Sequence, residues 1–127
     1  MYIKVYVAGA ISDPNPAKML GNLRKGMREA TRLLLRGYIP FCPFLDHQFF
    51  FQLQNGEEIS VEQIQTYSIE WLKVCDVVYV MPNSENSIGT QREIETAMGN
   101  TPPIPVVYNE EELQCVRTRL MGIRAGA

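Results

Sequence analysis

The chain has 127 residues, of which 46% are hydrophobic and 20% are charged, and this size and composition predict one globular domain over residues 1–127. Lysine and arginine number 12 and acidic residues 14, giving a formal net charge of −2. This balance argues against a nucleic-acid polymer as partner, because binding to one depends on a basic surface. The N-terminus lacks the features of a signal peptide and no apolar run approaches membrane-spanning length, so we expect a cytoplasmic protein.

Cysteine and histidine are too scattered to suggest a metal site. The cysteines, Cys42, Cys75 and Cys115, are odd in number and are interpreted as free thiols in a reducing compartment. With one histidine, His47, and no CxxC motif, the chain lacks the ligands of a zinc site, so His47 is interpreted as a loop residue.

Residues 2–8 form a β-branched and aromatic run that predicts a first strand, central in a sheet. Residues 9–16 follow as a loop rich in small residues, beginning at Gly9. Small residues there let a ligand approach the backbone, but a plain connecting turn has the same composition. The loop matches neither the GxGxxG fingerprint nor a P-loop.

Residues 17–36 predict a long amphipathic helix that ends at Gly37. The expected apolar stripe contains Leu20, Leu23, Met27, Ala30 and Leu34, and arginines and lysines fill the outer, solvated face. Residues 38–41 predict a second strand that is short and near an edge, because Pro40 cannot donate a hydrogen bond to a neighbour.

Residues 42–60 contain several phenylalanines and are expected to be irregular. Such aromatic side chains can stack on a flat base, pack at a subunit interface or cover the core. Ser60 is the predicted N-cap of a helix that reaches Val74. Ser68 is a polar residue on the inward stripe of that helix, and Asp76 beyond it is expected to accept hydrogen bonds from nearby backbone amides.

Residues 77–81 form an apolar run that predicts a buried strand, and the polar loop 82–86 joins it to a helix with Ser87 and Gly89 at its start. In α/β proteins, ligands bind at the carboxyl ends of parallel strands and against helix N-termini. The helix is expected to end at Gly99 and Asn100. The start of this helix is therefore the predicted position of a ligand site.

Glu93 lies one turn into this helix, four residues after Gly89, so both face the same way. Glu95 lies on the opposite, solvated face, and two carboxylates two residues apart on a helix do not meet. Glu93 can point into a crevice, or it can be a surface glutamate that supports the helix dipole. The expected inward stripe consists of Thr90, Ile94, Ala97 and Met98.

Residues 104–108 predict a fourth strand, and Asn109 is expected to cap a last helix over residues 110–121, followed by a loose tail over residues 122–127. Alternating strands and helices predict an α/β fold with a doubly wound parallel sheet in a flavodoxin-like three-layer sandwich.

Four segments, YVAGAIS, EWLKVCDVVYVMP, SxGxxxExxxA and PIPVVYNEEEL, together resemble the nucleoside 2-deoxyribosyltransferase superfamily. The chain is most similar to the small phage and bacterial branch, and it also resembles the 2′-deoxynucleoside 5′-monophosphate N-glycosidases. The resemblance runs from Tyr2 to about Leu113. It implies cleavage of an N-glycosidic bond in a nucleoside or nucleotide, by hydrolysis or base exchange, without a metal or organic cofactor.

The resemblance also implies roles for single residues. Glu93 falls on the glutamate that attacks the anomeric carbon or assists water there, and Tyr6 on the tyrosine that orients it. Ser87 falls on the residue that holds a 5′-phosphate, and Gly9 on the glycine against which the nucleotide lies. The other expected substrate contacts are Ala10, Ser12, Ser68, Asn83 and Gly89.

Two positions depart from the family pattern. Ser68 stands where the family has an aspartate that contacts the sugar and the leaving base, and Ala10 stands where the nucleotide hydrolases have a serine, with Ser12 close by. A weak hydrolase, an enzyme for a different nucleotide and a non-catalytic nucleotide-binding protein that retains the pocket all remain open. The resemblance further implies a homodimer or larger assembly with shared sites.

Overall fold

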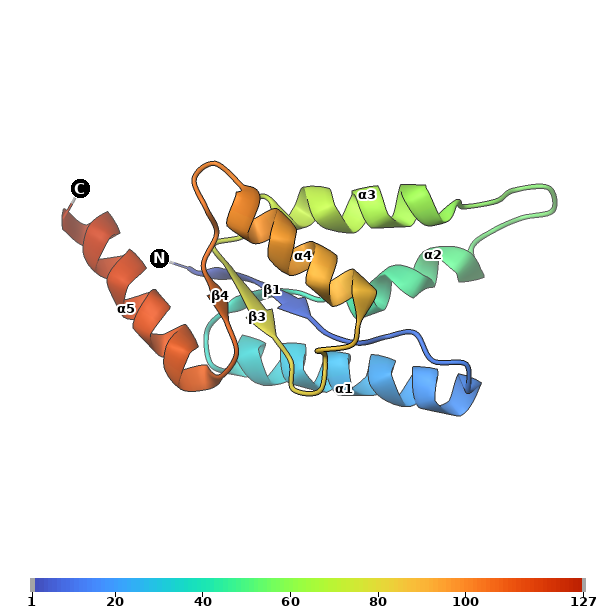
Figure 1. The fold of residues 1–127 in the computed structure, drawn as a ribbon, viewed down its shortest axis with the longest axis horizontal. Helices are drawn as coiled ribbons and strands as arrows, with labels where there is room; N and C mark the ends of the chain where they lie inside the picture. The colour runs from blue at the N-terminus through green and yellow to red at the C-terminus, as the bar shows by residue number, and fades with distance from the viewer. Residues whose placement is uncertain (1, 127) are drawn as a thin grey trace.

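The computed structural model describes residues 2–126, which form a four-stranded parallel sheet with helices on both faces (Figure 1). The strands are β1 (Lys4–Ala8), β2 (Ile39–Phe41), β3 (Val77–Val80) and β4 (Val106–Val107), in the order β2-β1-β3-β4. This order confirms the predicted doubly wound α/β fold, with β1 inside the sheet and β2 at its edge. None of the helices within residues 2–126 has both the length and the apolar composition that crossing a bilayer requires.

The helices make two layers around the sheet. Helices α3 (Val61–Leu72) and α4 (Ile88–Gly99) lie together on one face, and α1 (Pro16–Leu35) lies on the other (Figure 1). The last helix, α5 (Glu110–Gly126), packs on the α1 side of the sheet. Two short helical turns, η1 (Pro43–His47) and α2 (Gln48–Phe51), connect β2 to α3.

Successive side chains of β1 lie in two different cores, one on each face of the sheet. Val5 and Val7 are fully buried in the core beneath α1 and α5, whereas Tyr6 and Ala8 are fully buried in the core beneath α3 and α4. Neighbouring side chains of a strand point to opposite faces of the sheet, so one strand supplies both cores. Tyr6 therefore lies on the same face as α4, the helix that carries Glu93.

Hydrogen bonds at two helix starts confirm the predicted N-cap of α3 and the predicted start of α4. The amide of Gln63 donates to Ser60 Oγ at 3.0 Å and the Gln63 side chain accepts from the amide of Ser60 at 2.8 Å, which makes a capping box. Ser87 Oγ accepts from the amide of Thr90 at 3.2 Å at the start of α4. These polar residues fix where α3 and α4 begin.

The predicted structural role of Asp76 is also confirmed. Its Oδ2 accepts a hydrogen bond from the backbone amide of Lys4 at 2.8 Å, which joins the turn before β3 to the start of β1. Gly37 follows α1 with a φ of +91°, a conformation that glycine adopts without strain.

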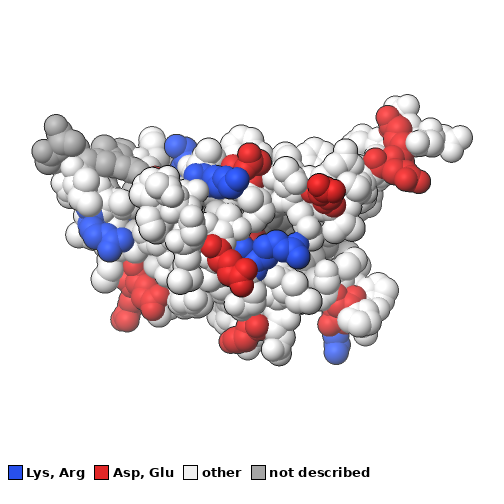
Figure 2. Space-filling view, turned by 45° about the horizontal axis from the view of Figure 1, so that its top comes forward, with Lys and Arg blue, Asp and Glu red and all other residues white. Residues whose placement is uncertain are grey.

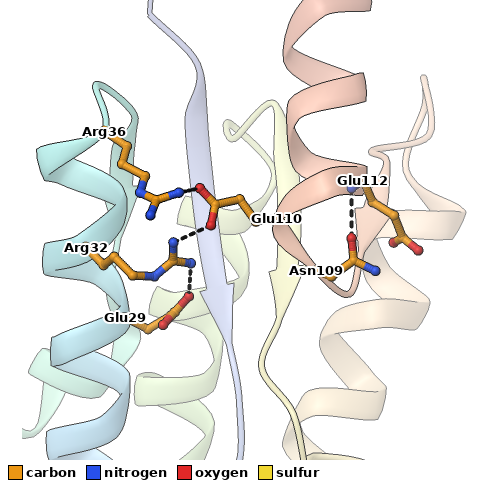
Figure 3. A network of polar contacts seen from close by, with 6 residues as sticks. All are labelled: Glu29, Arg32, Arg36, Asn109, Glu110 and Glu112. Atoms are coloured by element: carbon orange, nitrogen blue, oxygen red, sulfur yellow. Dashed lines mark hydrogen bonds and ion pairs between the residues drawn. The ribbon is translucent and has the colours of Figure 1, made fainter.

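Ion pairs join α1 to α5 on the side of the sheet away from α4 (Figure 3). Arg32 Nη1 donates to Glu110 Oε2 at 2.5 Å, and Arg36 pairs with the same carboxylate. Arg32, expected on a solvated face, therefore has a specific partner. Asn109 Oδ1 accepts from the amide of Glu112 at 2.9 Å, which confirms the predicted cap of the last helix.

Two expectations about irregular segments are wrong. The segment over residues 42–60 contains η1 and α2, because Pro43 favours a helical first turn and the amide of Leu45 donates to the carbonyl of Cys42 at 3.0 Å. The expected loose tail continues α5 to Gly126. Phe44 covers the core, but Phe51 is 86% exposed.

The expected apolar stripes of two helices are partly wrong. In α1 the buried residues are Gly26, Ala30 and Leu33, while Leu20 and Leu34 are exposed. In α4, Thr90 and Ala97 are fully buried as expected, but Met98 is exposed. Helical spacing permits more than one apolar stripe on such helices, and contact with the sheet decides which one is buried.

Candidate active site

A cavity of about 150 Å³, open to solvent on one side, lies beyond the carboxyl end of β1 on the face that α3 and α4 cover. Strand β1, the loop after it, η1, α3 and α4 all contribute to its wall. The lining residues are Tyr6, Gly9, Ile11, Pro43, Asp46, His47, Ile64, Gln65, Ser68, Ile69, Gly89, Arg92 and Glu93. The cavity lies where a doubly wound fold places its ligands.

Glu93 projects from the second turn of α4 into this cavity and is half-buried, whereas Glu95 is exposed. Burial raises the pKa of the Glu93 carboxyl to about 7, the phenol of Tyr6 acts in the opposite direction, and the charge of Asp46 adds to the increase. Of the two interpretations of Glu93, the structure favours the one in which its side chain points into a crevice. A carboxyl group with this pKa ionises near neutral pH, as groups that exchange protons or attack carbon often do.

Tyr6 supplies the floor of the cavity from β1. Its side chain is fully buried, and its hydroxyl has no hydrogen-bond partner among residues 2–126 within normal bonding distance. Burial and the neighbouring Glu93 raise the pKa of Tyr6 well above its usual range, so the phenol keeps its proton. Its ring stacks on Phe41 with 5.6 Å between centroids, which holds the hydroxyl in place.

Ser68 and Asp46 form a hydrogen-bonded pair in the same wall. Ser68 Oγ donates to Asp46 Oδ2 at 2.6 Å, which joins α3 to η1. Asp46 is only 6% exposed, and burial raises its pKa, while Ser68 and His47 lower it. Sequence reasoning missed Asp46, because it belongs to no motif and lies in the segment expected to be irregular. The one available signal is a carboxylate within a run of apolar and aromatic residues.

His47 also lines the cavity, although it was interpreted as a loop residue. It lies at the end of η1, and its buried Nδ1 has no hydrogen-bond partner among residues 2–126. Over the same part of the chain, no cluster of three or more His, Cys, Asp or Glu side chains is arranged to hold a metal ion. Cys42, Cys75 and Cys115 are free thiols.

The two glycines of the cavity have different local surroundings. A Cβ on Gly9 would lie 3.1 Å from the side chains of Met81 and Phe44, so packing alone already favours glycine there. A Cβ on Gly89 would have no atom within 4 Å, so the space beside this residue is open. Gly89 therefore leaves room for a ligand at the start of α4.

The structure brings Tyr6, Gly9, Ser68, Gly89 and Glu93 together around one cavity, as expected of a shared site. The remaining predicted residues lie elsewhere. Ala10 and Asn83 line a neighbouring hollow together with Lys25 and Arg28, Ser87 lines a third hollow, and Ser12 is exposed.

Arg92 connects the Glu93 cavity to the hollow beside Ser87, since it lines both. Ser87 Oγ already accepts from the amide and the hydroxyl of Thr90, the latter at 2.9 Å. Figure 2 shows acidic and basic side chains interspersed over this side of the molecule. Arg92 is thus a cation that lines both hollows, and nothing in the sequence singled it out.

No model of a known protein family matches this chain, and no curated protein matches it.

Proposed function

We propose that this protein cleaves the N-glycosidic bond of a nucleoside or deoxynucleoside, or of its 5′-monophosphate, with the Glu93 carboxylate acting at the anomeric carbon. The chain is, in this proposal, a member of the nucleoside 2-deoxyribosyltransferase superfamily. The observation that carries the proposal is the position of Glu93, half-buried beside Tyr6 in a cavity at the carboxyl end of β1.

Breaking an N-glycosidic bond develops positive charge on the sugar, as in the hydrolysis of O-glycosides. The ionised Glu93 stabilises this charge and forms an ester bond to C1′, while the electron pair of the broken bond leaves with the base. The protonated phenol of Tyr6 orients the carboxylate. Water or a second base then takes the sugar and releases Glu93, which distinguishes hydrolysis from base exchange.

Charge at the start of α4 supports a 5′-monophosphate as the substrate. Arg92 lies between the Glu93 cavity and the hollow beside Ser87, so a phosphate there meets a guanidinium group and a helix N-terminus. In this proposal the phosphate lies at the 5′ end of the sugar, and Glu93 lies near the anomeric carbon.

The cavity is smaller than the roughly 300–1,000 Å³ that is common for ligand sites, and it is open on one side. We propose that a second copy of the chain completes the site, in a cytoplasmic homodimer or larger assembly. Phe51, which is 86% exposed on α2, belongs to the surface expected to make this contact. Sedimentation equilibrium measures the assembly, and a strictly monomeric protein at micromolar concentration would contradict this part of the proposal.

Incubation with each common nucleoside, deoxynucleoside and 5′-monophosphate, followed by chromatography of the free base, tests the activity. We expect base release from at least one substrate and a loss of at least about 100-fold in Glu93→Gln. The control is Glu62→Gln, which removes an exposed carboxylate of α3 that lines neither the Glu93 cavity nor the hollow beside Ser87, and leaves the rate unchanged.

Tight nucleotide binding without base release from any substrate would instead identify a non-catalytic nucleotide-binding protein. A chain that shows no thermal shift with any of these compounds would contradict both interpretations and indicate a structural role. Base release that persists in Glu93→Gln would contradict the assignment of this residue.

A further inference from the structure

The cavity contains a second carboxyl group, that of Asp46, for which the proposed cleavage has so far no use. Asp46 reaches the cavity from η1, and it is only 6% exposed. Its Oδ2 accepts from Ser68 Oγ at 2.6 Å, and its Oδ1 has no hydrogen-bond partner among residues 2–126. One oxygen is therefore held in place while the other is left for a ligand.

A purely structural role explains this arrangement poorly. Burying a carboxyl group is unfavourable unless a cation or several donors compensate, and no ion pair to Asp46 forms within the described chain. The hydroxyl of Ser68 is its one hydrogen-bond donor there. An asparagine or serine could join η1 to α3 at lower cost, so the acidic group itself requires an explanation.

We propose that Asp46, oriented by Ser68, is the proton donor to the departing nucleobase. This inference rests on the proposed N-glycosidic cleavage. As Glu93 forms its bond to C1′, the C1′–N bond breaks and its electron pair stays on the base nitrogen system. The carboxylic acid of Asp46 gives its proton to the base, which leaves neutral. In the second half of the reaction the Asp46 carboxylate takes a proton from the attacking water, whose oxygen bonds to C1′ and releases Glu93.

In this proposal the bound substrate determines which of the two carboxyl groups, Asp46 or Glu93, carries the proton. The charge of Asp46 raises the pKa of Glu93, so a proton on Asp46 favours the ionised form of Glu93. With one proton on the pair, a lone pair of the base beside Asp46 favours its protonated form. The positive charge that develops at C1′ favours ionised Glu93. The bound nucleotide therefore selects the reactive arrangement of the single proton.

Leaving groups that need no proton provide the test. Wild type, Asp46→Asn and Glu93→Gln are compared on the common deoxynucleoside 5′-monophosphates and on two probes. The probes are 7-methyl-2′-deoxyguanosine 5′-monophosphate, whose base is already cationic, and 4-nitrophenyl 2-deoxyriboside 5-phosphate, whose leaving group is a stable anion. We expect Asp46→Asn to lose at least about 100-fold on the natural substrate and less than about 10-fold on a probe. Glu93→Gln is expected to lose activity on all of them.

The outcomes separate this inference from the proposed function. Equal losses on natural substrates and probes in Asp46→Asn, or no loss on either, would overturn the role of Asp46 and leave the cleavage by Glu93 standing. Absence of base release by the wild-type protein would overturn both. A thermal melt of each variant shows that the comparison is made on folded protein, and Glu62→Gln, which removes an exposed carboxylate from α3, is the control for charge.

Ser68→Ala tests the positioning role. Ser68 lowers the pKa of Asp46, so its loss raises the pKa of Asp46 and moves the pH profile of kcat/KM toward higher pH. A merely structural hydroxyl would change the amount of folded protein and leave the profile in place, which would overturn the role of Ser68. The titratable and charged groups around Asp46 that contribute to the profile are Tyr6, Cys42, His47, Arg92 and Glu93.

Discussion

At the scale of single residues, the site combines a carboxyl group whose ionisation is disfavoured with a phenol that has no partner. Burial in the cavity raises the pKa of Glu93, and Tyr6 has a buried hydroxyl without a hydrogen bond. Both features lower the stability of the folded chain and both suit the proposed chemistry. Functional sites commonly keep such unfavourable burial of polar groups, because activity requires these groups although they lower stability.

The raised pKa of Glu93 predicts a stability that depends on pH. Below about pH 4 the side chain is protonated in both the folded and the unfolded chain, and it has no effect. Between the usual value of 4.5 and the folded value of about 7, the unfolded chain releases the proton that the folded chain keeps, so the free energy of unfolding falls as pH rises. Glu93→Gln should therefore be more stable than wild type above pH 7, by at most about 3 kcal/mol.

Urea denaturation of wild type and Glu93→Gln across this pH range measures the difference. Glu95→Gln is the control and should follow the wild-type curve, because Glu95 is exposed. A difference between wild type and Glu93→Gln that stays constant from pH 4 to pH 8 would show that the Glu93 carboxyl is not perturbed by burial.

Tyr6→Phe tests the phenol independently of the fold. The hydroxyl has no hydrogen-bond partner within residues 2–126, so its removal should change the free energy of unfolding by less than about 1 kcal/mol. Activity should fall by about 10-fold or more, because the variant loses the phenol beside Glu93 that favours the ionised carboxylate. Tyr38 is a matched control: its hydroxyl is also buried and unpaired, but it lies in the core on the other face of the sheet. Equal activity of Tyr6→Phe and Tyr38→Phe would contradict the role of Tyr6.

At the scale of elements, the position of η1 depends on one glycine of α1. A Cβ on Gly26 would lie 2.3 Å from Cγ of Phe44, which is 2% exposed and belongs to the same turn as Asp46. Phe44 therefore packs directly on the backbone of α1. The contact sets the height of η1 above the sheet and with it the position of Asp46.

Gly26→Ala should displace η1 and lower both stability and activity. We expect a loss of about 1–3 kcal/mol in the free energy of unfolding, since ring and backbone atoms cannot yield at little cost. Gly21→Ala is the control on the same helix, where a Cβ has no atom within 4 Å. That variant should gain about 0.5–1 kcal/mol from helix propensity and keep its activity. A loss of stability in Gly21→Ala as large as that in Gly26→Ala would contradict the packing argument.

At the scale of the whole molecule, the sheet separates two cores, and we expect them to differ in their effect on the activity of the site. Leu33 and Leu72 are both fully buried; Leu33 belongs to α1, and Leu72 is the last residue of α3, the helix that carries Ser68. Replacement of either by alanine should cost about 2–5 kcal/mol. Leu72→Ala should also lower the activity of the protein that remains folded, because the Ser68–Asp46 bond depends on the position of α3.

Thermal unfolding and activity per folded molecule measure the two effects separately. Leu33→Ala should retain its activity at temperatures where it is folded, because Leu33 does not line the Glu93 cavity and belongs to the core on the other face of the sheet from Tyr6. Retained activity in Leu72→Ala, or an equal loss in Leu33→Ala, would contradict the prediction that only the core beneath α3 and α4 affects the site.

The fold was predictable because its signals are local. Apolar runs fix β1 and β3, the hydroxyls of Ser60 and Ser87 start two helices, and Asp76 accepts the backbone bond expected of it. The buried stripe of α1 could not be predicted in this way, because several apolar residues of that helix repeat at helical spacing. Which of them meets the sheet is a property of the packing.

The sequence by itself determined the doubly wound fold and the placement of Glu93 near the start of a helix, and the family resemblance pointed to Tyr6. Only the tertiary structure decided that Asp46 and Ser68 share the cavity with them, and that Ala10, Asn83 and Ser87 line other hollows. The physical reason is distance along the chain. Caps and alternating apolar residues act within a few positions, whereas the Ser68–Asp46 bond joins residues 22 positions apart and exists only once η1 packs on α1.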